Sequence, residues 1–169
     1  MKCLIGLIAP YETPTRINHP RLGQVTVLIR RGAFAPIVGK GPPVLIAHDR
    51  RRRIAEAFLF TNNAGLYGII DLPTRSQQLE VVRYARHCGV RGVRVRASVH
   101  IGESESYWSA PPARIETITR VASLVEVSLI GTPAYKSTWL ALDSDDARRR
   151  IAREDVDARE RELLEMKAS

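Results

Sequence analysis

The stretch Val121-Ala-Ser-Leu-Val-Glu-Val-Ser-Leu-Ile-Gly-Thr-Pro-Ala134 is a run of apolar, mostly β-branched residues interrupted by one acid, Glu126. A carboxylate inside a strand of this kind is costly unless something uses it. An acid on a mostly buried sheet usually has a partner, and histidine is a common one. His48, at the end of another short apolar run, is available for that role.

Alternation along this strand predicts which residues share a face. Successive side chains of a strand point to opposite sides of the sheet. Val125, Val127 and Leu129 are therefore expected on one face, and Glu126 and Ser128 on the other.

Length and composition favour one compact domain with an appendage. The chain has 169 residues, of which 44% are hydrophobic, enough to build a core. No apolar run reaches the roughly 18 residues that span a bilayer, so no membrane association is expected. The apolar first ten residues are interpreted as an opening strand rather than a signal peptide. Cys3 and Cys88 form no metal-like cluster, which favours a reducing, intracellular setting.

The net charge of +8 is partly concentrated in two arginine blocks, residues 50–53 and 148–150. Such blocks can serve nucleic acid or acidic proteins. Aromatic residues are few and do not interleave with the basic ones, so a stacking surface for single strands is not indicated. The first block is interpreted as a solvated surface loop.

Local patterns predict mostly strands. A hairpin turn is expected at 62–65 and a polar loop at 102–112. One helix begins at Pro73–Thr74, with Thr74 as N-cap and Gln77 three residues on, and ends near Gly89; its apolar face is expected to hold Leu79, Val82 and Ala85. The predicted strands are residues 3–8, 24–29, 44–47, 54–61, 66–71, 93–101, 115–122 and 124–130.

The C-terminal segment differs in kind from the rest. From residue 143 onward there is no Gly or Pro, and acid-to-base pairs recur at helical spacing. A domain of residues 1–142 is therefore expected, followed by a charged helical tail of residues 143–169. The tail either docks on a partner or stays solvated.

Three residues could together perform acyl transfer. A serine hydroxyl needs a neutral imidazole to take its proton, and the imidazole needs a third group to fix its tautomer and steady its charge. Ser98 lies in Val-Arg-Ala-Ser-Val-His, His48 in Leu-Ile-Ala-His-Asp, and Glu126 in the closing strand. Spacing alone does not distinguish this triple from other combinations of serine, histidine and acid.

Several segments, in order, resemble the prohead (capsid maturation) serine proteases of tailed phages. The resemblance covers residues 24–135 or so. Its segments are Arg31-Gly-Ala-Phe34, Pro43-Val-Leu-Ile-Ala-His-Asp49, Ala64-Gly-Leu-Tyr-Gly68, the strand 93–101 where the nucleophile is expected, and Glu126-Val-Ser-Leu-Ile-Gly-Thr-Pro-Ala134.

This resemblance implies an α+β fold: a mostly antiparallel β-barrel of the herpesvirus-assemblin type with flanking helices. It implies a serine endopeptidase without cofactor or metal. Carried over by position, Ser98 is the nucleophile, His48 the general base and Glu126 the third member. Asp49 and His100 remain alternatives for the third role, since the assemblins use a second histidine there.

The resemblance also implies where the enzyme acts and on what. Its expected location is the assembling prohead in the host cytoplasm. Its expected partners are scaffolding protein or the scaffolding segment of the major capsid protein, and further copies of itself.

One departure from the family pattern leaves a second function open. Gly92-Val-Arg-Val-Arg96 could align with the nucleophile strand, which would put Arg94 at the serine position and make the chain inactive. The register with Ser98 is preferred because Ala97-Ser-Val99 matches an apolar-Ser-apolar core. In the other register the protein would be a capsid-assembly or scaffold-binding module.

Overall fold

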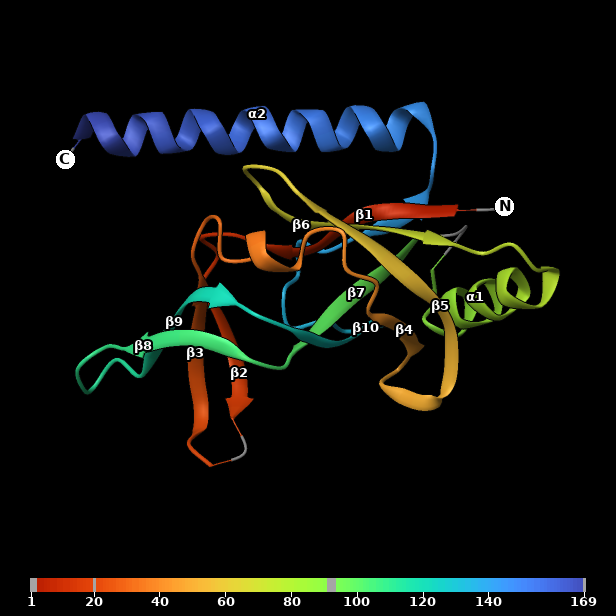
Figure 1. The fold of residues 1–169 in the computed structure, drawn as a ribbon, viewed down its shortest axis with the longest axis horizontal. Coiled ribbons are helices and arrows are strands. Elements are labelled where there is room, and N and C mark those ends of the chain that lie inside the picture. The colour runs from red at the N-terminus through yellow and green to blue at the C-terminus, as the bar shows by residue number, and fades with distance from the viewer. Residues whose placement is uncertain (1–2, 20, 91–93, 169) are drawn as a thin grey trace.

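The computed structural model describes residues 3–19, 21–90 and 94–168. Seven strands form a closed barrel (Figure 1), in the spatial order β1-β11-β7-β10-β4-β5-β6. Neighbouring strands are antiparallel except β10 and β4, which are parallel. The strands are β1 (Cys3–Pro10), β4 (Pro43–Ile46), β5 (Asp49–Thr61), β6 (Gly65–Asp71), β7 (Arg94–Ile101), β10 (Leu124–Ile130) and β11 (Leu140–Leu142).

In the part of the chain that the structure describes, two helices accompany the barrel, α1 (Arg75–His87) and α2 (Asp145–Ala168), with a short 3-10 turn, η1, at Ala35–Ile37. The predicted α+β architecture, a mostly antiparallel barrel with flanking helices and a charged C-terminal helix, is therefore confirmed. The predicted boundary between a domain at 1–142 and a tail at 143–169 stays a prediction. Position 93 of the predicted strand 93–101 lies outside the described residues.

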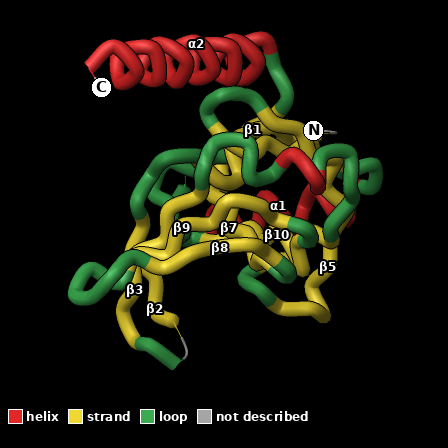
Figure 2. The backbone as a smooth tube through the Cα atoms, turned by 60° about the vertical axis from the view of Figure 1, so that its left-hand side comes forward, coloured by secondary structure: helices red, strands yellow, loops and turns green. Residues whose placement is uncertain are grey.

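A second sheet projects from one side of the barrel (Figures 1 and 2). Its order is β2 (Thr15–His19), β3 (Gly23–Ile29), β9 (Ile115–Val121) and β8 (Ser104–Trp108). The prediction of a polar loop at 102–112 was wrong, because β8 lies within it. All five residues of β8 are exposed, so the strand shows no alternation of apolar and polar side chains. It is held by backbone pairing with β9.

The first arginine block lies in a strand, so its interpretation as a surface loop was wrong. Arg50 to Arg53 belong to β5, which pairs with β4 from its first residue. Their side chains stay exposed and are partly neutralised: Arg51 binds Asp49, Arg52 binds Glu80 and Arg53 binds Glu56.

The barrel interior is filled by one large apolar cluster. Val127 and Leu129 of β10 lie on the same face of the strand, as predicted, and both are fully buried in this cluster. Val125 does not join them and is 38% exposed. A β-bulge between Leu124 and Glu126 shifts the register there and breaks the strict alternation.

Helix α1 begins as the sequence predicts. The Thr74 side chain accepts from the backbone N–H of Gln77, and the Gln77 side chain accepts from that of Thr74. The predicted apolar face was partly wrong, because the buried residues are Val81, Tyr84 and Ala85, whereas Leu79 is 42% exposed. Tyr84 and Ala85 follow Val81 at the i+3 and i+4 spacing of one helical face.

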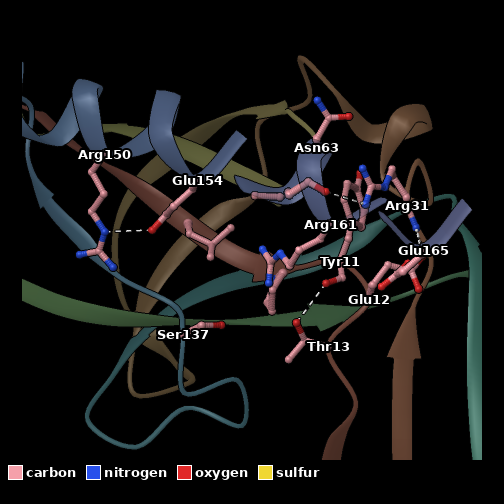
Figure 3. A pocket seen from close by; sticks show the side chains of 14 residues that line it. Tyr11, Glu12, Thr13, Arg31, Asn63, Ser137, Arg150, Glu154, Arg161 and Glu165 are labelled. Carbon is pink, nitrogen blue, oxygen red and sulfur yellow. Dashed lines mark hydrogen bonds and ion pairs between the residues drawn. The ribbon is translucent and has the colours of Figure 1, made fainter. Parts of the chain in front are cut away.

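Helix α2 lies along the barrel and is held largely by polar contacts. Glu154 accepts hydrogen bonds from Tyr67 Oη (2.7 Å) and Trp139 Nε1 (2.9 Å). Asp155 accepts two from Asn63, both at 2.8 Å. A cavity of about 300 Å³ lies between helix and barrel (Figure 3). The helix therefore docks on this chain itself, with little apolar burial.

Removing Glu154 should loosen α2. Glu154→Ala leaves the Tyr67 and Trp139 donors without their acceptor, so we expect a loss of about 1–3 kcal/mol in the free energy of unfolding. Hydrogen exchange should quicken across α2. The control is Glu160→Ala, an exposed acid on the same helix. Equal exchange in the two variants would contradict docking of α2 through Glu154.

Candidate functional site

A two-residue turn presents His48 to the barrel wall. Ala47 and His48 connect β4 and β5, and their φ angles are 53° and 60°. Two-residue hairpin turns of this kind require positive φ at both positions, which costs free energy for residues other than glycine. The Ala47 N–H donates to the carbonyl of Leu129 at 2.9 Å, which ties the turn to β10.

The turn brings His48 to Glu126. Nδ1 of His48 lies 2.5 Å from Oε1 of Glu126, and Ser128 Oγ donates to the same oxygen at 2.8 Å. Glu126 is only 4% exposed, whereas the His48 side chain is 49% exposed. The buried acid therefore has two donors, and it shares a strand face with Ser128 as the alternation predicts.

The environment of Glu126 keeps it ionised. Burial alone would raise the pKa of its carboxyl group, but hydrogen bonds from His48 and Ser128, and the nearby charges of His48 and His100, bring this pKa below its usual value. An ionised carboxylate can only accept hydrogen bonds, so Nδ1 of His48 carries a proton. In the neutral ring Nε2 is then the nitrogen free to accept a proton.

Strand β7 carries Ser98 and His100 next to this pair. In the antiparallel register Ser98 lies opposite Ser128, and His100 opposite Glu126. Directly opposite residues share a face, with Cβ atoms about 4.5–5.5 Å apart. The register thus puts Ser98 beside the residue that bonds Glu126. The described residues include no hydrogen bond between Ser98 and His48.

The rival positions are less well placed. Arg94 pairs with Ala141 of β11 and is four residues from Ser98, about 13 Å along the strand. The Asp49 carboxylate binds Arg51 through its backbone N–H and its guanidinium. His100 is exposed and close enough to Glu126 to influence its pKa.

Ser128 is the member of this cluster that sequence reasoning did not assign. Its position two residues after Glu126, on the same strand face, is a signal that could have identified it as a partner. Its hydroxyl is fully buried. It therefore serves as a second support of the acid rather than as an accessible nucleophile.

In the ranges 3–19, 21–90 and 94–168, no three His, Cys, Asp or Glu side chains gather to hold a metal ion. Cys3 and Cys88 are free thiols. Neither helix in these ranges has the length and apolar character needed to cross a bilayer.

The lowered pKa of Glu126 predicts a pH-dependent stability. Because this pKa is lower in the folded than in the unfolded chain, the carboxylate stabilises the fold above its ordinary value of 4.5 and loses this effect as the pH falls through the folded pKa. Wild type should exceed Glu126→Gln by about 1–3 kcal/mol in unfolding free energy near pH 6. That difference should shrink as the pH falls below 4.5.

Urea unfolding of both chains at several pH values measures this difference. Glu103→Gln, at an exposed carboxylate, is the control and should differ little from wild type throughout. A wild-type advantage over Glu126→Gln that is unchanged at low pH would contradict an ionised, bonded Glu126.

Solved structures to which this chain is similar include proteases of Kaposi's sarcoma-associated herpesvirus. One, in complex with a hexapeptide phosphonate inhibitor, has 11% identity and a TM-score of 0.48, covering 91% of this chain and 76% of that one. Another, in complex with an allosteric inhibitor, has 13% identity and a TM-score of 0.48, covering 93% and 90%.

No curated protein sequence matches the chain. A family model does, that of the caudovirus prohead serine proteases, and the match runs over residues 4–150. It includes the His48 turn, β7 with Ser98 and β10 with Glu126. The chain belongs to the caudovirus prohead serine protease family.

Proposed function

We propose that this protein is a serine endopeptidase of phage capsid maturation. It cleaves scaffolding protein, or the scaffolding segment of the major capsid protein, inside the assembling prohead in the host cell, and it also cleaves itself. Family membership supports the protease class and the setting. The observation that carries the catalytic proposal is the 2.5 Å contact between His48 Nδ1 and Glu126 Oε1, beside the strand that bears Ser98.

In this proposal Ser98 Oγ attacks the scissile carbonyl carbon and its proton passes to Nε2 of His48. The imidazolium that forms is stabilised by the ionised Glu126 at Nδ1. His48 then gives the proton to the leaving amine, and water releases the acyl group from Ser98 by the same route. Glu126 stays ionised throughout, and Ser128 holds it in place.

Glu126 is the proposed third member because it has the direct contact with His48. Asp49 is engaged by Arg51, which argues against it. His100 remains a supporting group: its place opposite Glu126 lets it add positive charge near the acid. Replacing His100 should therefore cost less activity than replacing Glu126.

Covalent labelling tests the nucleophile. Ser98→Ala should abolish reaction with a fluorophosphonate probe and lower peptide cleavage by about 10³-fold or more. Ser128→Ala is the matched control, since this serine lies directly opposite on the same face. It should still be labelled at Ser98, though more slowly, because the buried Ser128 hydroxyl is a donor to Glu126 and not the nucleophile. Mass spectrometry of the labelled peptide identifies the modified residue.

The outcomes separate the two functions left open by the sequence. Labelling that persists in Ser98→Ala, or is lost only in Ser128→Ala, contradicts the assignment of the nucleophile. No labelling of wild type, either purified at high concentration or inside assembled proheads, supports an inactive barrel that serves capsid assembly or binds scaffold.

A further inference from the structure

A cavity of about 650 Å³ opens beside the turn that carries His48. Ala47 of that turn lines it on one side, and Gly131 and Thr132, directly after β10, line it on another. Helix α1, its C-cap residue Cys88 and β5 supply the remaining wall, which includes two arginines and one histidine: Arg52, Glu80, Arg83, Tyr84, His87 and Cys88. The cavity therefore adjoins both elements that hold the His48–Glu126 pair.

Positive charge is in excess in this cavity. Arg52 is neutralised by Glu80, which accepts from its Nε at 3.2 Å and its Nη2 at 2.5 Å. The Arg52 guanidinium also lies over the Tyr84 ring, 5.9 Å from its centroid. Arg83, one helical turn beyond Glu80, makes no ion pair with the described residues. The Arg83 guanidinium can therefore bind a carboxylate of a ligand in the cavity.

The position of the cavity relative to Ser98 fits a peptide bound across the site. Ser98 lies opposite Ser128, and Gly131 follows Ser128 by three residues. In extended backbone, the three residues from Ser128 to Gly131 span about 10 Å. A substrate lying along the same direction would cover this distance with about three residues. Arg96, opposite Ile130, lies on the way and adds a further exposed cation on the face of Ser98.

We propose that this cavity is a substrate subsite for an Asp or Glu side chain two or three residues from the scissile bond, with Arg83 as the residue that selects it. The guanidinium group of Arg83 can bind a carboxylate through two parallel hydrogen bonds. A lysine or a neutral amide in the substrate cannot accept this pair of hydrogen bonds. Tyr84 and the Arg52–Glu80 pair form the wall beside it. The subsite rests on the proposed protease function.

Cleavage of a peptide library defines the preference. The full chain is incubated with a mixed peptide library and the cut sites are read by mass spectrometry. An acidic residue should be enriched at one position within about three residues of the cut. A peptide pair with Glu or Gln at that position should then differ about tenfold in kcat/KM.

Charge variants on α1 test the role of Arg83. Arg83→Gln should bring the Glu-to-Gln ratio close to one, and Arg83→Glu should make the corresponding Lys peptide the better substrate. The matched control is Arg86→Gln, an exposed arginine in the last turn of α1 that does not line the cavity. This control should keep the wild-type ratio.

Three results would overturn the subsite while leaving the protease proposal intact. They are cleavage without any acidic preference, a Glu-to-Gln ratio unchanged in Arg83→Gln, and an equal loss of that ratio in Arg86→Gln. Fluorophosphonate labelling of wild-type Ser98 reports the protease function separately. Absence of both labelling and cleavage contradicts the proposed function, and the subsite with it.

Discussion

The hydrogen bond between His48 and Glu126 is the contact on which the site depends. It joins a hairpin turn with two positive φ angles to an acid buried in the barrel wall. Each half is costly alone, because a buried carboxylate needs donors and a non-glycine turn of this shape is strained. Together, with Ser128 as second donor, they form a fixed unit with an ionised acid.

The barrel topology assembles the neighbours of this unit. β10 pairs with β4 in parallel on one side, which delivers the His48 turn, and with β7 in antiparallel fashion on the other, which delivers Ser98 and His100. One strand thus carries the acid between the strands that bring the proposed base and the proposed nucleophile. The same arrangement leads the end of β10 toward α1, where the basic cavity lies.

Much of the architecture could be predicted because the local sequence patterns agree with the contacts made in the folded structure. The cap at Thr74 and the apolar run of β10 are examples. Predictions failed where a tertiary contact overrode the local pattern. Leu79 is apolar and was predicted on the buried face of α1, yet it is exposed, while Tyr84 is buried. The charges of Arg50 to Arg53 indicated a surface loop, yet these residues belong to β5, whose backbone pairs with β4.

The sequence by itself determined the fold class, the family resemblance and the pairing of Glu126 with Ser128 on one face, because alternation and ordered motifs are local properties of the chain. The tertiary structure decided which histidine meets the acid, and that Ser98 rather than Arg94 lies beside that pair. These positions depend on the register between strands, on a bulge at Val125 and on the conformation of a two-residue turn. They arise from contacts between segments far apart in the chain, which no local pattern records.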